Sequence, residues 1–431
     1  MNDHTLTRRG ALAALGALAG CSATNPLGDD RTELDGASVR ALVDDSVPAV
    51  PDRLPVGVGS AHLAASEERA RALLDAVPAS LGPEEIPNGA MRERIRQKRE
   101  YAVESLDAAT EAPTPFERLD ALAGARGEAR FAAGAWRAID AGQTRDDLLD
   151  EAGTVRDDRA AFRDRWRYLG GDPAVAVRVH AEIEERVDAG RADIALGEPR
   201  RYRVGNPLGV GEIAEEIERA RVAVDDAAHC YDRLLASVDD PTGLRTRFLD
   251  ARRAVREAFE AERDDLPPID SEEPWQVEGV DTEDTPAAEA LEELYRPIDP
   301  RHDDGWDDEW PARSLHWAHA SLIGLRAFAS LRTRVADGET FTVESADDVA
   351  AVRGEAVEAV RAAAAEPTIL ERPALTDAVA RLEHADDRLT EVRDDVSVVQ
   401  IRNEVGQYLV VMARARAVSS ASERVVEALR S

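Results

Sequence analysis

The sequence predicts an all-α fold, either a multi-helix bundle or an array of helical hairpins. From residue 64 onward, long segments rich in Ala, Arg, Glu, Leu and Val alternate with proline and glycine breaks. Two of these segments place apolar residues at alternating steps of three and four, which is the spacing of a heptad seam. Signals for β-strands are confined to two short stretches, 54–58 and 340–343.

Proline and glycine set the ends of the predicted helices, because proline cannot continue a helix and glycine readily closes one. The breaks lie at Pro78, 87–89, Pro113, Pro115, 170–173, Pro241, Pro267, Pro268, Pro367 and Pro373. Between them, the predicted helices span 64–77, 90–110, 116–140, 145–169, 173–196, 211–238, 242–264, 286–296, 312–336, 346–365, 373–395 and 398–430.

The two seams predict close antiparallel packing of helices within a bundle, because many of their residues are small. Asp386 interrupts the second seam, so Ala385 is expected to make the contact there. The first seam consists of Ile213, Ile217, Ala220, Val224, Ala227, Tyr231 and Leu234. The second consists of Val379, Leu382, Leu389, Val392, Val396 and Val399.

The two halves of the chain resemble each other when the sequence is shifted by 197 residues. That shift pairs Gly127, Phe131, Ala132, Arg137 and Asp140 with Gly324, Phe328, Ala329, Arg334 and Asp337. The pairing predicts an internal duplication of a four-helix unit, at about 125–238 and 322–431. The alternative is a chance match between helices that are all rich in Ala and Arg.

The first residues have the pattern of a targeting signal. Arg8 and Arg9 follow a threonine, a mildly apolar stretch spans 11–19, and Leu18-Ala19-Gly20-Cys21 follows. Nine weakly apolar residues are too few to span about 30 Å of hydrocarbon as a helix. The segment resembles a twin-arginine (Tat) signal peptide that ends in a lipobox. This resemblance implies export in the folded state, cleavage before Cys21, and a lipid on Cys21 that anchors the chain at the outer face of the cell membrane.

Composition shifts predict five segments. The resemblance implies that residues 1–20 are the signal peptide and that 21–60 hold the lipidated cysteine and a tether. A helical unit is expected over 61–265 and a second over 312–431. The segment between them, 266–311, is acidic and rich in proline, which predicts a long connection.

The charge of the chain excludes some partners. It holds 86 Asp and Glu against 54 Lys and Arg, a formal charge of −32, and Lys98 is the only lysine. Such a chain is repelled by polyphosphate and by anionic lipid, so nucleic-acid binding is excluded. High acidity with almost no lysine resembles the proteins of halophilic archaea. An acidic protein from a GC-rich mesophile is the alternative.

One window could hold a metal. His316 and His319 are three residues apart on a predicted helix, and His302 precedes them in a loop rich in Asp and Trp. Three such ligands suit a transition metal such as zinc or iron, with Asp307 or Glu309 as a base. In the alternative interpretation, the tryptophans of this window pin the loop onto the bundle and the histidines are structural.

A second window could hold an anion. Arg200, Arg201 and Arg203 precede glycines and a predicted helix start, where backbone N–H groups and the helix dipole attract negative charge. In the alternative interpretation, these arginines pair with carboxylates of the chain itself.

Cys230 is predicted to be a small buried side chain and not a nucleophile, because it lies within an apolar helical run. The sequence thus favours a membrane-anchored extracytoplasmic lipoprotein that acts as a helical scaffold or binds a protein of the cell envelope. The alternative is an extracytoplasmic metal- or ligand-binding protein, or an enzyme, that uses the region of His302, His316 and His319.

The halophilic interpretation predicts a strong dependence of stability on salt. We expect the melting temperature, followed by circular dichroism, to rise between about 0.1 M and 3 M KCl. The reason is that the screening length falls to about 3 Å at 1 M salt, which removes most of the self-repulsion of the carboxylates. An unchanged melting temperature would contradict this interpretation.

Overall fold

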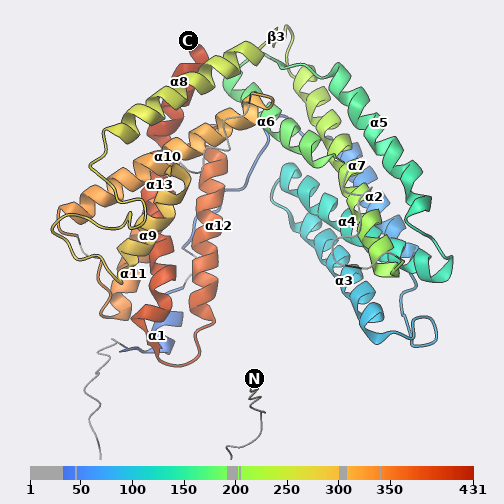
Figure 1. Ribbon diagram of the computed structural model, residues 1–431, viewed down its shortest axis with the longest axis horizontal. Helices are drawn as coiled ribbons and strands as arrows, with labels where there is room; N and C mark the ends of the chain where they lie inside the picture. Colours follow the sequence, from blue (N-terminus) through green and yellow to red (C-terminus); the bar gives the residue numbers. More distant parts are fainter. Residues whose placement is uncertain (1–32, 44–45, 192–201, 203–204, 300–307, 340) are drawn as a thin grey trace, which may run out of the picture.

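The structure is a computed structural model that describes residues 33–43, 46–191, 202, 205–299, 308–339 and 341–431 (Figure 1). Its helices confirm the all-α prediction. They are α1 (Gly36–Arg40), α2 (Ser60–Asp75), α3 (Gly89–Glu111), α4 (Pro115–Asp140), α5 (Leu149–Arg165), α6 (Pro173–Ala189), α7 (Pro207–Ala236), α8 (Arg245–Asp264), α9 (Pro286–Tyr295), α10 (Pro311–Ala336), α11 (Ala346–Ala363), α12 (Glu371–Thr390) and α13 (Val398–Arg430), with 3₁₀ turns at Asp146–Leu148 and Arg296–Ile298. Among the described helices, none combines the length and the apolar character of a membrane-spanning segment.

The helix ends follow from local capping. Asp172 accepts hydrogen bonds from the backbone N–H groups of Ala174 and Val175 and so starts α6, and Asn88 caps α3 in the same way. Strand pairing is limited to two-residue strands. β1 (Glu33–Leu34) pairs with β4 (Val396–Ser397), and β2 (Leu169–Gly170) pairs with β3 (Thr242–Gly243). The expected strand stretches 54–58 and 341–343 form no strand.

The chain forms two six-helix units, α2–α7 and α8–α13, which lie as two arms of an arch in Figure 1. Helices α4 and α10 each have 26 residues and begin with a proline. In the first unit α4 packs on α2, α3 and α7, and in the second unit α10 packs on α8, α9 and α13. This arrangement agrees with the predicted duplication and extends it from four helices to six.

The predicted boundary between the units was wrong. We expected residues 242–264 in the first unit, but α8 packs on α10 and α13, and its Phe248 and Val255 are buried in the second core. The segment 266–311 is not a bare connection either, because α9 lies against α13 and buries Leu291 and Leu294. Periodicity identified these helices but could not show which neighbours cover their apolar faces.

Residues 33–43 and 46–59 also differ from the prediction of a tether. This segment, which we call the strap, begins beside β4 in the second unit and ends at α2 in the first (Figure 1). Val39 is buried in the second core, whereas Leu54 is buried in the first. Between them, the Val50 carbonyl accepts a hydrogen bond from Thr376 at 2.8 Å. The strap therefore holds the two units together.

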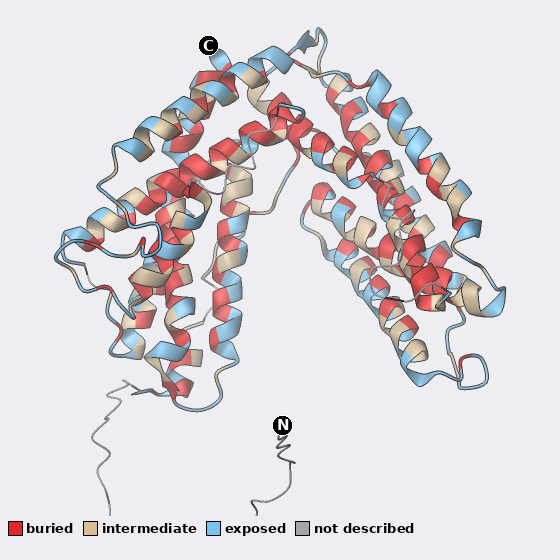
Figure 2. Cartoon of the chain, in the orientation of Figure 1, coloured by how far each residue is buried: buried red, intermediate tan, exposed pale blue. Residues whose placement is uncertain are grey.

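Helix α6 contributes to both cores. Val177 and Ala181 are buried in the core of the second unit, whereas Val179, Ile183 and Val187 are buried in the core of the first. These two sets repeat every four residues, so they lie on different faces of the helix. Figure 2 shows buried residues through α6, where the two arms meet. A helix embedded on both sides joins the units without a flexible linker.

The first seam is buried throughout, as predicted, and α7 packs closely on α4. A Cβ atom added to Gly134 of α4 would lie 2.7 Å from the Cβ of Ala214, so only glycine permits this approach. The prediction of the second seam was wrong at its C-terminal end. Val399 is 49 % exposed, because α12 ends at Thr390 and the chain turns before α13 begins.

Candidate functional site

Several residues singled out from the sequence lie outside the described residues. These are Arg8, Arg9, Cys21, Arg200, Arg201, Arg203, His302 and Asp307. The lipidation site, the anion site and one of the three metal ligands are therefore not placed by the structure.

The two described histidines of the metal prediction point to different surroundings. His319 is buried in α10, and its Nε2 lies 2.9 Å from Ser422 Oγ on α13, whereas His316 is exposed. Burial lowers the pKa of His319 to about 3, so this ring is neutral. Within the described ranges, no three His, Cys, Asp or Glu side chains gather as a metal site would require.

Trp310, from the same window, packs onto the bundle as the alternative interpretation of this window predicts. Trp310 is buried, and its ring lies 6.3 Å from that of Trp166. Arg163 of α5 contacts the Trp310 ring and also pairs with Glu309 at 3.2 Å. Glu309 thus belongs to the contact between the units.

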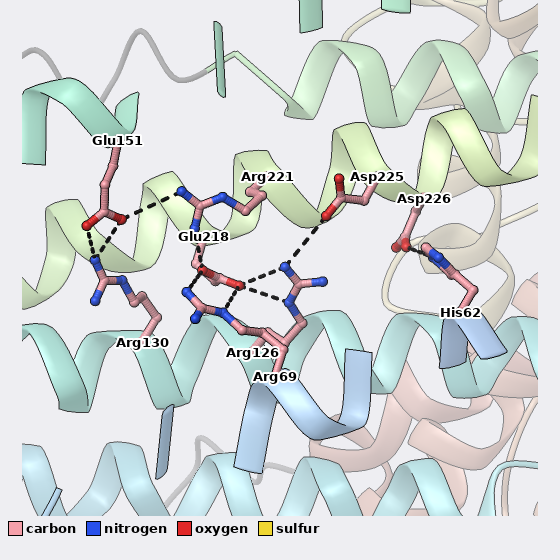
Figure 3. A network of polar contacts seen from close by, with 9 residues as sticks. All are labelled: His62, Arg69, Arg126, Arg130, Glu151, Glu218, Arg221, Asp225 and Asp226. Atoms are coloured by element: carbon pink, nitrogen blue, oxygen red, sulfur yellow. Dashed lines mark hydrogen bonds and ion pairs between the residues drawn. The ribbon is translucent and has the colours of Figure 1, made fainter. Parts of the chain in front are cut away.

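A buried polar cluster that the sequence did not indicate surrounds Glu218 (Figure 3). This carboxylate is fully buried on α7 and binds three guanidinium groups. Arg126 of α4 lies 2.7 Å from it, Arg69 of α2 lies 3.0 Å away, and Arg221 of α7 also lies 3.0 Å away. Glu218 therefore fixes α2, α4 and α7 relative to one another.

The arginines around Glu218 more than offset the free-energy cost of burying its charged carboxylate. Burial alone would raise its pKa, but the hydrogen bonds from Arg69 and the charge of Arg126 lower it to about 2. The cluster continues to α5, where Arg130 binds Glu151 at 2.9 Å. Because each buried charge here has an opposite partner, the cluster is suited to holding helices together.

A histidine pair lies at the other end of this cluster. His62 Nε2 is 2.6 Å from Asp226, and the ring stacks on His229 with 4.2 Å between centroids. His229 Nε2 accepts a hydrogen bond from the backbone N–H of Gly59, and burial lowers the pKa of His229, so this ring is neutral. Arg186 of α6 also binds Asp226, at 3.2 Å.

A histidine–aspartate pair can serve as a general base, but it needs a group to activate. The thiol on the same helix, Cys230, does not fit that role. It is buried, as predicted, and burial raises its pKa to about 12, which keeps it protonated and unreactive.

The joint between the units contains a second buried carboxylate. Glu184 of α6 accepts hydrogen bonds from the backbone N–H groups of Ala312, at 3.1 Å, and Arg313, at 2.5 Å, in the first turn of α10. The Tyr168 hydroxyl also hydrogen-bonds to it. Burial raises the pKa of Glu184 to about 7 against the effect of these donors. A side chain of the first unit thus caps a helix of the second.

His180 completes the joint. Its ring is fully buried, and burial lowers its pKa to about 4. Nδ1 accepts the indole N–H of Trp166 at 3.1 Å, since tryptophan can only donate. The hydrogen therefore lies on Nε2, which donates to the Leu169 carbonyl at 3.0 Å. This neutral histidine holds the chain that connects α5 to α6.

The second unit has a buried pair of its own. Arg353 of α11 binds both carboxylate oxygens of Asp386 on α12, at 2.8 and 2.7 Å. The Tyr408 hydroxyl of α13 donates to the same carboxylate at 2.6 Å, and Ser46 of the strap lies 3.2 Å from the guanidinium. Ala385 is buried as well, so both residues at the interruption of the seam face inward.

Comparisons with known proteins divide the chain at the same place as the structure does. Residues 61–240 match a family model described as a domain of unknown function (DUF8262), and residues 245–427 match a second, described as a domain of unknown function (DUF8264). No curated protein and no solved structure matches the chain. The two units thus match separate family models.

The Glu218 cluster predicts acid sensitivity. Because its pKa is lowered, Glu218 contributes stability above pH 4.5 that is lost as the pH falls toward 2. We expect Glu218→Gln to reduce the free energy of unfolding by about 3–5 kcal/mol at neutral pH, since it leaves buried arginines short of a partner. The difference from the unmodified chain should shrink as the pH is lowered.

The measurement is denaturant unfolding in high salt at several pH values. Glu67→Gln is the matched control. Glu67 pairs with Arg71 and Arg118 near the surface, and its loss should cost less than about 1 kcal/mol. If the two substitutions reduced the free energy of unfolding equally, the Glu218 cluster would contribute no more to stability than a surface ion pair.

Proposed function

We propose that this protein is a lipid-anchored, extracytoplasmic helical scaffold that presents a fixed surface to a protein partner of the cell envelope. The observation that supports this proposal is the joint. Helix α6 lies in both cores, and Glu184 caps α10 across the boundary between the units. A chain that buries a carboxylate and a histidine at its joint maintains one shape, which is what a scaffold requires.

The proposed anchor would hold the second unit next to the membrane. Cys21 precedes Glu33 by twelve residues, and Glu33 pairs with Ser397 at one end of the second unit. Twelve residues reach at most about 40 Å when fully extended. The end of the second unit that carries α1 and β4 would therefore lie next to the membrane.

The surface that we assign to the partner lies on the outer side of α3 in the first unit. A hollow of about 750 Å³ there is lined by Leu81, Val103 and alternating Arg and Glu side chains. Val103 is 47 % exposed, which makes it one of the few large apolar side chains on the described surface. Exposed apolar side chains ringed by charge are typical of protein interaction sites.

The test is crosslinking in intact cells that export proteins by the twin-arginine route. Amine-directed reagents are unsuitable because Lys98, the only lysine, is 7 % exposed, so a carboxyl-directed dihydrazide crosslinker is the reagent to use. We expect one defined complex, which Val103→Glu should weaken by introducing charge into the contact. Val399→Glu is the matched control, since Val399 is equally exposed but lies in the other unit.

If crosslinking of the protein without substitutions yields only the free monomer, the scaffold proposal is contradicted. The anchor is tested separately by Cys21→Ser, which should move the protein from the membrane fraction to the soluble fraction. If the protein stays in the membrane fraction after this substitution, the lipid anchor is contradicted. The crosslinking experiment would still test the protein partner independently.

A further inference from the structure

The last residues of the strap are held to α7 through a titratable side chain. Gly59, the strap residue that precedes α2, donates its backbone N–H to Nε2 of His229 on α7 at 2.9 Å. A Cβ atom added to Gly59 would lie 3.1 Å from Cε1 of the same ring, so the backbone approaches the imidazole closely. No described side chain caps the start of α2, so the bond to His229 is what fixes this end of the helix on α7.

This hydrogen bond requires a neutral His229. A neutral imidazole has one nitrogen that accepts a hydrogen bond, whereas an imidazolium carries a hydrogen on both nitrogens. A backbone N–H can only donate, so Gly59 is bound only while Nε2 of His229 is unprotonated. Turning the charged ring over would not restore the bond, because neither of its nitrogens can accept. His229 is only partly buried, so protons from the solvent reach it.

His62 of α2 opposes the protonation of His229. The two rings are stacked, with 4.2 Å between their centroids and 3° between their planes. Nε2 of His62 lies 2.6 Å from Asp226, a fully buried carboxylate that also binds Arg186 at 3.2 Å (Figure 3). The carboxylate favours a positive charge on His62. A proton on His229 as well would place two parallel cations face to face.

Charged groups from several helices surround the two rings. Arg233 donates from its Nε to the Gly57 carbonyl of the strap at 2.8 Å, and Asp232 pairs with Arg165 of α5 at 2.7 Å. The groups that face the rings are His62 of α2, Asp225, Asp226, Asp232 and Arg233 of α7, Arg186 of α6 and Arg165 of α5. Burial, followed by the charge of His62, lowers the pKa of His229 below its ordinary value of 6.5 against the attraction of Asp226.

We propose that His229 and His62 form a pH-sensitive clasp, which holds the end of the strap on α7 in a neutral medium and releases it in an acidic one. The release is local. Asp52 stays bound, because Arg178 pairs with its carboxylate at 3.1 Å and Glu117 accepts its backbone N–H at 2.8 Å. Val56 is buried in the first core, so the released part is residues 57–59 and the first turn of α2.

The clasp is independent of the scaffold proposal, because it concerns how the strap is held and not what the surface binds. The direction of the pH effect follows from the lowered pKa of His229. The clasp is fully closed above about pH 6.5, and its contribution is lost as the pH falls further, since the released ring binds a proton more tightly than the clasped one.

The test is hydrogen–deuterium exchange of the full chain in high salt, resolved to single residues by mass spectrometry. The measured quantity is the protection factor of the Gly59 amide, which is its intrinsic exchange rate divided by its observed rate at the same pH. Ala90 is the internal reference, because its amide donates to Oδ1 of Asn88 at 3.1 Å, an acceptor that does not titrate. We expect the Gly59 protection factor to fall at least about tenfold relative to that of Ala90 between about pH 7.5 and about pH 4.5.

His229→Gln should abolish this fall, because an amide oxygen near the position of Nε2 accepts from Gly59 at every pH. All other titratable groups, Glu184 among them, are the same in both proteins, so the comparison isolates His229. His62→Gln should move the fall to higher pH, since it can still donate to Asp226 but cannot become charged. His384→Gln is the matched control, because His384 is exposed on α12 of the other unit, and it should change nothing.

Thermal melts would show that each variant is folded, and the comparison of Gly59 with Ala90 in the unmodified chain stands without any variant. A Gly59 protection factor that follows that of Ala90 at every pH would overturn the proposal. So would a fall that persists in His229→Gln, because another group would then be responsible. An unchanged midpoint in His62→Gln would contradict the part that the proposal gives to His62.

Discussion

The arrangement of the two units depends on the double burial of α6. One face of this helix packs in the first core and another in the second, so neither core is complete without it. Glu184 adds a directional contact, because it accepts two backbone N–H groups at the start of α10 that would otherwise be buried without partners. The strap reinforces the same joint, since it runs from the second core to the first.

Buried ion pairs recur through the structure, and they fix geometry more than they add stability. Removing Glu218 or Asp386 from water is costly, and the arginines around each of them offset that cost. Each carboxylate connects at least three elements, so a shift of one helix would leave a buried charge without its partner. In high salt, where exposed pairs are screened, such buried pairs keep most of their strength.

The helices could be predicted from the sequence because their signals are local. Proline breaks and apolar periodicity located every helix of ten or more residues, whereas the placement of α8 and the strap depends on contacts between distant segments. Asp386 stood out because it interrupts a seam. Glu218 did not, because it lies one residue off the seam in a chain where acids are common. The single lysine was noticed only as a feature of composition, and the sequence did not show that Lys98 pairs with Glu128 and Glu215.

The most direct test of the fixed joint is a distance measurement between the units by electron spin resonance. Spin labels on cysteines introduced at the exposed positions Glu104 of α3 and Glu383 of α12, with Cys21 replaced and Cys230 buried, report on both arms. A rigid joint predicts one narrow distance distribution, which Glu184→Ala should broaden. A broad distribution in the unmodified joint, unchanged by Glu184→Ala, would contradict the account.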